Sequence, residues 1–287
     1  TYREDGRKSF LSIVLKKRVS KKKRRAVINQ QLHKVKRNLA SINELKKHAD
    51  LSLLKPSLYR ELLVIGTLYQ QQQYMYENKV TSVDDRIVSL HQPHIRPIVR
   101  GKAGAHTEFG AKISISVVDG WTFTDTISFD SYNEGTELIE QIEKYKERFG
   151  YYPESTHADK IYRNKENRAY CKKHGIRISG PSLGRPPKDE KLRKEQKKIQ
   201  GQDEAIRNAV EGRFGVVKRR YKLDRILTKI KASSESLIAL VFMVMNLEKA
   251  MAFMAFIYLC FLKEVRRFSK QIQRTTQIGA FKMLVIQ

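Results

Sequence analysis

Hydrophobic residues recur at helical spacing through the first part of the chain. The segment from Lys16 to Asp50 contains no proline or glycine, and its first ten residues are mostly basic. The apolar residues that follow at helical spacing are Val27, Leu32, Val35, Leu39, Ile42 and Leu45. Pro56 breaks this pattern, and a second helix is predicted from Leu58 to Tyr76. The sequence therefore predicts a helical segment over residues 1–80.

The residue composition changes at Arg86, where short runs rich in β-branched and aromatic residues begin. These runs predict strands at Ile87–Leu90, Ile95–Val99, Lys112–Val118, Trp121–Phe129, Glu154–Ala158 and Ile176–Ser179. Asp119 and Gly120 between two of them form a typical hairpin-turn pair, and we expect Trp121 to be a core residue. Strands that then alternate with helices predict an α/β domain over residues 81–250.

Three helices are expected within that domain. They are Leu138–Phe149, Asn164–His174 and Gln202–Lys218, the first closed by Gly150 and the second by Gly175. A lysine-rich connector with glycine and proline runs from Pro181 to Gly201. Two interpretations of this connector stay open, a solvated loop and a segment that contacts DNA.

One apolar stretch, Ser236 to Leu262, has the composition of a membrane span. Asn246, Glu248 and Lys249 divide it into uncharged runs of 12 and 13 residues. A helix that crosses a membrane needs about 20 consecutive apolar residues. The division favours a buried helix and no membrane partner, followed by a helical tail over residues 251–287.

Charge limits the possible partners of the chain. Its 57 Lys and Arg against 30 Asp and Glu give a formal net charge of +27 in 287 residues. Such an excess repels itself in a compact fold unless a polyanion screens it, and nucleic acid is the first candidate. The densest basic run is Lys16–Arg25, where Lys21, Lys22, Lys23, Arg24 and Arg25 are expected to contact phosphates.

Cysteine usage is sparse and gives no sign of a disulfide framework. Cys171 and Cys260 lie far apart and form no CxxC pattern, so neither a disulfide nor a zinc site is predicted. A reducing compartment is therefore expected, and for a DNA-binding protein this is the cytoplasm, in association with the nucleoid.

Two carboxylates stand in positions suited to chemistry. Asp159 follows an expected strand and precedes a helix, which places it at the sheet edge where ligands bind in α/β folds. Glu211 shares one face of its helix with Arg207 and Lys218. By pattern alone, a salt-bridged surface helix is the favoured explanation of this face.

The arrangement Arg207-x3-Glu211-x6-Lys218 resembles the arginine–glutamate–lysine signature of insertion-sequence DDE transposases. Further strings resemble the same family in the same order: RIVSLHQPHIRPIVRGK, TEFGAKISIS, HADKIYRNKENRAYCKKHGIRISGPSLGRP, RNAVEGRFGVVKRRYKLDRI and MNL at Met245–Leu247. The resemblance is densest from Arg86 to Leu247. One departure is Glu204, which stands where the family usually has a tyrosine.

The resemblance implies a fold and a mechanism. The fold would be an RNase H-like mixed sheet flanked by helices. Asp159 and Glu211 would ligate two Mg²⁺ ions, with Mn²⁺ as a possible substitute, for strand cleavage and strand transfer. Residues implied to contact DNA are Arg207, Lys218, Arg213, Arg219 and Arg220. The partners would be double-stranded transposon ends and target DNA, bound by a homodimer.

The third carboxylate that the family needs is not evident. Similar proteins carry it on an opening strand, and this sequence opens on Thr1, so we expect that strand and its aspartate to be absent. Asp84, Asp85 and Asp119 are the substitutes, although aspartate in a turn such as that at Asp119 is common for backbone reasons. Three functions stay open: a transposase inactive in this chain, a DNA-binding remnant, and an RNA- or ribosome-associated protein.

Overall fold

A computed structural model describes residues 2–99, 107–130, 132–181 and 189–284, and it divides the chain into two units. The first unit comprises residues 1–112, 127–132 and 228–233, and the second comprises residues 113–126, 133–227 and 234–287. The architecture is mixed α/β, as predicted. The described strands form three two-stranded sheets, and helices make up most of the rest.

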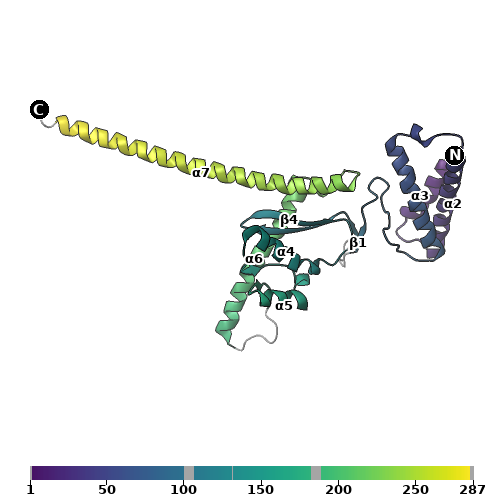
Figure 1. The fold of residues 1–287 in the computed structure, drawn as a ribbon, viewed down its shortest axis with the longest axis horizontal. Coiled ribbons are helices and arrows are strands. Elements are labelled where there is room, and N and C mark those ends of the chain that lie inside the picture. Colours follow the sequence, from purple (N-terminus) through teal and green to yellow (C-terminus); the bar gives the residue numbers. More distant parts are fainter. Residues whose placement is uncertain (1, 100–106, 131, 182–188, 285–287) are drawn as a thin grey trace. The chain divides into compact units, whose positions relative to one another are not determined.

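The first unit opens with three helices, α1 (Tyr2–Val14), α2 (Lys21–Leu45) and α3 (Pro56–Glu77), with a short 3₁₀ turn η1 at Leu51–Leu53. Pro56 occupies the first turn of α3, where its missing N–H costs no hydrogen bond. The helices therefore agree with the predicted stretches (Figure 1). Few apolar side chains hold them together, since only Leu32 in α2 and Met75 in α3 are buried.

A small antiparallel sheet completes the described part of the first unit. β1 (Pro97–Val99) pairs with β2 (Thr107–Phe109). The strand predicted at Ile87–Leu90 is wrong, because the segment forms no ladder. Instead, the Ile87 N–H donates to Oε1 of Gln71 on α3 at 2.9 Å. A side chain has taken the place of a neighbouring strand as the hydrogen-bond partner at this point.

The second unit begins with a hairpin of β3 (Lys112–Val118) and β4 (Trp121–Ser128), as the alternating pattern predicted. Asp119 and Gly120 have positive φ angles of 49° and 77°. Two consecutive left-handed residues define the two-residue turn that matches the twist of paired strands. Helix α4 (Leu138–Phe149) contacts this hairpin: Lys144 Nζ donates to the Asp125 carbonyl at 2.9 Å, and Arg148 donates to the Asp125 carboxylate at 2.8 Å.

A parallel strand pair forms the other sheet of the second unit. β5 (Ser155–Thr156) pairs with β6 (Arg177–Ile178), and α5 (Lys165–Lys173) connects them. The 3₁₀ turns η2 (Glu134–Thr136) and η3 (Lys160–Tyr162) precede α4 and α5. A compact apolar cluster lies between the helices and the strands, formed by Leu138, Ile142, Cys171 and Ile176, with Tyr152, Tyr162, Tyr170 and Ile178 packed against it.

Helix α6 (Glu190–Arg220) begins earlier than predicted, so most of the connector after Asp189 is helical rather than a loop. Asp189 caps the helix by accepting from the Lys191 N–H at 2.8 Å, and Glu190 pairs with Lys194 one turn later at 3.0 Å. Lysine and glutamate are good helix formers, and their abundance outweighed Gly201. Residues 182–188 of the connector lie outside the described residues.

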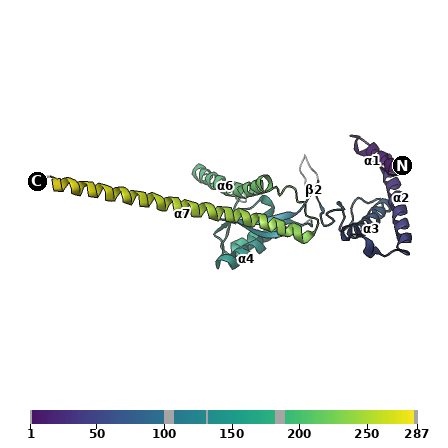
Figure 2. The same ribbon diagram turned by 90° about the horizontal axis from the view of Figure 1, so that it is seen from above.

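The last helix, α7 (Lys231–Leu284), is the longest and has two different environments. Ser234, Ile238, Phe242 and Met245 are buried where the helix packs on α6 and the hairpin (Figures 1 and 2). From Met251 to Ile272 its large apolar side chains, apart from Leu262, are exposed. The expectation of a buried helix through Leu262 is therefore wrong for its second half, because the described residues offer no packing partner there.

By length and composition, Lys231–Ile272 of α7 could cross a membrane, and it is the one helix among the described residues that could.

Candidate active site

Asp159 occupies the predicted place at the end of a strand. It follows β5 and caps the 3₁₀ turn η3, where its side chain accepts from the Lys160 N–H at 3.3 Å. The loop that carries it is fixed from behind by Asn167, whose buried amide donates to the carbonyls of Gly135 at 2.7 Å and Tyr162 at 2.8 Å. The Asp159 side chain is 67% exposed and accessible to a ligand.

The structure brings Asp159 to helix α6. Arg207 Nη1 lies 3.0 Å from Asp159 Oδ1, and Glu204 is 3.6 Å from the same guanidinium. Glu211 is exposed one helical turn beyond Arg207 on the same face of α6. Lys218 is exposed about two turns further along. Asp159 and Glu204 thus lie near one arginine, and the contact of Asp159 with Arg207 is one that the sequence pattern alone did not establish.

A buried ion-pair cluster lies next to this surface, and sequence reasoning missed it. Asp203 on α6 accepts two hydrogen bonds from Arg177 on β6, at 2.7 and 2.9 Å. These bonds hold the pKa of the Asp203 carboxyl below its ordinary value, against the opposing effect of burial. The sequence signal was its spacing, since Asp203, Arg207 and Glu211 recur every four residues on one helical face.

His157 joins that cluster from β5. Its Nδ1 lies 3.3 Å from Asp203 Oδ1, and its Nε2 lies 3.0 Å from the Ser155 hydroxyl oxygen. Burial lowers the pKa of His157, although the neighbouring carboxylate of Asp203 opposes this. The side chains of His157 and Asp203 are only 13% and 7% exposed, so neither faces a substrate. The cluster instead fixes α6 against β5 and β6, and so sets the position of Arg207 relative to Asp159.

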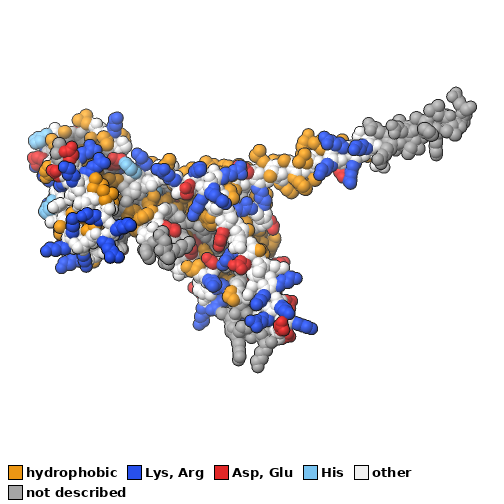
Figure 3. Space-filling view, turned by 180° about the vertical axis from the view of Figure 1, so that it is seen from behind, with side chains coloured by type: hydrophobic (Ala, Val, Ile, Leu, Met, Phe, Trp, Pro, Cys, Tyr) orange, Lys and Arg blue, Asp and Glu red, His pale blue; other side chains and the backbone are white. Residues whose placement is uncertain are grey.

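The predicted phosphate-contacting cations fall into two groups. Some are engaged within the protein: Arg213 donates to the Gly120 carbonyl at 2.9 Å, Arg220 pairs with Glu248 at 2.9 Å, and Arg25 lies 4.0 Å from the Tyr76 ring. The others have exposed side chains, namely Lys21, Lys22, Lys23, Arg24, Lys218 and Arg219. Figure 3 shows Lys and Arg side chains gathered in clusters on the surface. The exposed group can reach a polyanion, although Arg219 must give up the 3.3 Å hydrogen bond from its Nε to the Gly215 carbonyl.

The candidate substitutes for a third carboxylate have other local explanations. Asp85 has a positive φ of 52° and lies 3.4 Å from Arg96. Asp84 and Asp85 both belong to the first unit, whereas Asp159 and Glu211 belong to the second. Asp119 has a left-handed backbone and forms the hairpin turn. Among the described residues, no three His, Cys, Asp or Glu side chains are grouped closely enough to hold a metal ion.

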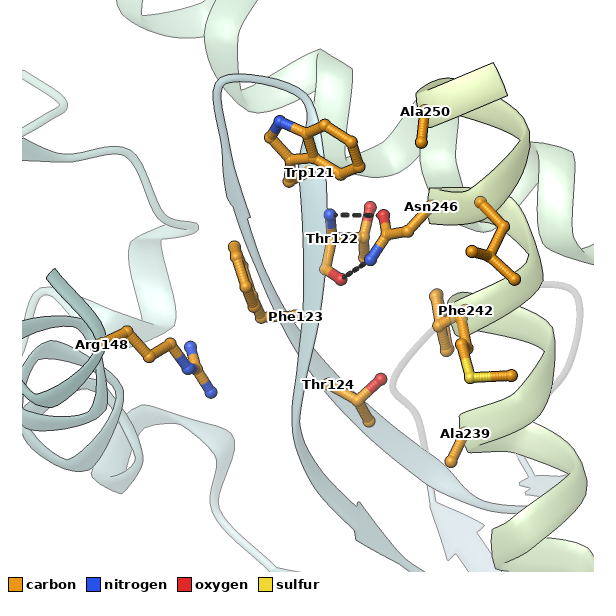
Figure 4. Close-up of a pocket in the computed structure, with 11 residues that line it drawn as sticks. Trp121, Thr122, Phe123, Thr124, Arg148, Ala239, Phe242, Asn246 and Ala250 are labelled. Carbon is orange, nitrogen blue, oxygen red and sulfur yellow. Dashed lines mark hydrogen bonds between the residues drawn. The ribbon is translucent and has the colours of Figure 1, made fainter. Parts of the chain in front are cut away.

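A groove of about 340 Å³ lies in the second unit between β4 and α7 (Figure 4). Its floor is formed by Asn246, whose amide accepts from the Thr122 N–H at 3.0 Å and donates to the Thr122 carbonyl at 2.7 Å. Trp121 lines the groove and is only half-buried, with Lys249 Nζ 4.7 Å from its ring. The expectation that Trp121 is a core residue is therefore wrong.

Comparison with known families gives one match. Residues 156–248 match the family model described as "Transposase DDE domain". The matched segment begins in β5, contains Asp159, Asp203, Arg207 and Glu211, and ends in α7 two residues after Asn246. No curated protein and no solved structure matches the chain.

Proposed function

We propose, from the match of residues 156–248 to the transposase DDE domain model, that the chain binds DNA as an insertion-sequence transposase but does not cut it unaided. Transposases act on DNA, so DNA is the partner that the family implies. The observation that carries the proposal is the contact between Asp159 and Arg207 of α6 at 3.0 Å, within the matched segment, with Glu211 one turn further along the same helix. If α6 were only a surface helix stabilised by its own salt bridges, its Arg207 would not require a partner such as Asp159, which comes from the end of a strand.

The chain has too few carboxylates grouped together among the described residues to ligate the metal ions that cleavage would need. Domains of this family typically use divalent metal ions, which prefer several carboxylate oxygens. Here Asp159 and Glu211 are two carboxylates, and one oxygen of Asp159 is already engaged by Arg207 at 3.0 Å. With no third donor grouped among the described residues, this set does not fit two metal ions. We therefore derive no metal-dependent step for the chain as it stands.

Its own side chains can still bind and orient a DNA strand. Lys218 presents an exposed point charge on α6, and Arg207 can bind a phosphate with two parallel hydrogen bonds if it gives up its 3.0 Å contact with Asp159. In the other unit, Lys21 to Arg24 are exposed at the start of α2, where backbone N–H groups also favour anions. These contacts would position a duplex by its backbone and would not read its sequence.

The same proposal includes an RNase H-like fold, a homodimeric DNA-bound form and association with the nucleoid. The order of elements supports the fold: a hairpin, then α4, then a parallel pair with Asp159 after its first strand, then a helix with Glu211. The net charge of +27 supports residence on DNA rather than free in solution.

The test uses the full chain on labelled duplexes. One duplex carries the terminal sequence of the transposable element, and one unrelated duplex of equal length serves as control. Binding is measured by fluorescence anisotropy, and cleavage is measured on denaturing gels with Mg²⁺ or Mn²⁺. Asp159→Ala and Glu211→Ala are assayed beside the unaltered chain. We expect all three proteins to bind and none to cut.

Two results would contradict the proposal. Cleavage by the unaltered chain that either substitution abolishes would show that the two carboxylates already suffice, or that Asp84 or Asp85 completes the site. Binding to an RNA duplex of the same sequence in clear preference to DNA would replace the transposase function with an RNA-binding one. Glu204→Ala is the matched control, since Glu204 lies on the same helix and is as exposed as Asp159.

A further inference from the structure

Helix α7 carries an apolar seam that repeats every seven residues. Counting alternate steps of three and four from Leu237 gives only apolar residues for 36 positions: Leu237, Leu240, Val244, Leu247, Met251, Met254, Tyr258, Phe261, Val265, Phe268 and Ile272. A strict seven-residue repeat keeps one narrow stripe facing a partner helix along its whole length. Over this stretch the seam runs for about 52 Å, at 1.5 Å per residue.

The seam is distinct from the face by which α7 packs on its own domain. Ile238, Phe242 and Met245 are buried, and they lie on the side of the helix away from the seam. The seam residues from Met251 to Ile272 are 47–66% exposed. In Figure 3 the apolar side chains of this part of α7 stand in the open and are followed by a group of basic ones. The helix therefore has one occupied face and, from Met251 to Phe268, one seam whose apolar side chains are exposed.

The pattern after Leu262 argues against a lipid bilayer as the partner. The uncharged run of Ala250–Leu262 is only 13 residues, about 20 Å long, whereas a bilayer core is about 30 Å thick. Beyond it, Lys263, Glu264, Arg266, Arg267 and Lys270 surround the helix while the seam continues through Val265, Phe268 and Ile272. A narrow apolar stripe between charged faces is the pattern of a helix that pairs with another helix in water.

We propose that the seam of α7 pairs with the α7 seam of a second copy of this chain. The available area is sufficient: seven residues from Met251 to Ile272, each about half-exposed, offer roughly 100 Å² apiece, or about 700 Å² per helix. Stable interfaces bury about 800 Å² on each partner. The pairing names a surface for the homodimer in the proposed function, yet it needs no DNA and stands or falls independently of DNA binding.

The test exploits phenylalanines of equal exposure on and off the seam. Phe261 and Phe268 lie on the seam and are 62% and 66% exposed, whereas Phe253 and Phe256 lie off it and are 60% and 63% exposed. The full chain, the Phe261→Asp/Phe268→Asp variant and the Phe253→Asp/Phe256→Asp variant are compared by sedimentation velocity over a concentration series without DNA. Sedimentation with vesicles of phosphatidylcholine and phosphatidylserine is measured in parallel.

We expect the unaltered chain to dimerise, the seam variant to dissociate at least about 100-fold more readily, and the off-seam variant to change less than about threefold. Circular dichroism should show equal helix content in all three. A chain that stays monomeric at every concentration would overturn the proposal. So would equal weakening of assembly by both variants, or vesicle binding that both variants reduce alike, since a membrane does not distinguish the seam from the rest of the helix.

Discussion

Removing Arg177 and removing Asp203, the two partners of the buried ion pair, should lower the free energy of unfolding by different amounts. Asp203 is 6% exposed, whereas the side chain of Arg177 is 49% exposed. In Arg177→Ala, the Asp203 carboxylate remains in the interior without the guanidinium that neutralises it. In Asp203→Ala, the guanidinium remains but water can reach it. The first substitution should therefore destabilise the protein more than the second.

The magnitudes follow from the two geometries. Stranding one member of a buried pair costs about 3–5 kcal/mol, and the partial exposure of this pair favours the lower end, about 3 kcal/mol. Losing hydrogen bonds from a charged group that water then solvates costs about 1–2 kcal/mol. The difference between Arg177→Ala and Asp203→Ala should thus be at least about 1 kcal/mol. Adding Asp203→Asn to Arg177→Ala should recover part of the loss, because it removes the stranded charge.

Urea denaturation followed by circular dichroism measures each free energy of unfolding. Glu204→Ala is the control on the adjacent residue, whose side chain is 67% exposed, and it should change stability by less than about 0.5 kcal/mol. If Asp203→Ala cost as much as Arg177→Ala, or if Asp203→Asn failed to rescue, then the carboxylate would be solvated in solution. The clamp between α6 and β6 would then not be what holds Arg207 in place.

Three further outcomes are expected. Burial lowers the pKa of His157 below its ordinary 6.5, so unfolding takes up a proton and the free energy of unfolding should fall as pH drops below about 6.5. His157→Gln should flatten that slope, while the loss of stability that follows protonation of Asp203 below about pH 4 should remain. Asn246→Leu should cost about 2–3 kcal/mol in urea denaturation by leaving both backbone groups of Thr122 unpaired, and a cost below about 0.5 kcal/mol would show that water replaces the amide. Exchanging residues 21–24 for glutamate should weaken binding to all duplexes alike and flatten its salt dependence, whereas a loss confined to one sequence would reveal base reading.

Elements that form for local reasons could be predicted from local patterns of residues. The hairpin of β3 and β4 follows from alternation and from an Asp-Gly turn, and α4 has the bounds that its periodicity and Gly150 predict. Where prediction failed, a long-range partner decided the outcome. Ile87–Leu90 has strand composition, but Gln71 takes up the Ile87 N–H, and no sequence pattern announces that contact.

The candidate site divides in the same way. Asp159 could be placed at a strand end because the strand, the turn and the helix are all encoded nearby. Its contact with Arg207 joins residues 48 positions apart, and the Arg177–Asp203 pair joins residues 26 apart. Helical periodicity can show that Asp203, Arg207 and Glu211 share a face, but it cannot show which strand that face meets. For this reason the supporting cluster was missed, while the exposed carboxylates were not.

Asn246 has a consequence for how the protein behaves at high concentration. The backbone of an edge strand normally offers unpaired donors and acceptors that recruit strands from other molecules. At Thr122, one side-chain amide on α7 satisfies both the N–H and the carbonyl, as a neighbouring strand would. Strand addition at that position must first displace a contact anchored in a buried helix. The hairpin is thereby protected against strand addition at this position of its edge, and an amide two residues from the end of the matched family segment opposes aggregation rather than taking part in catalysis.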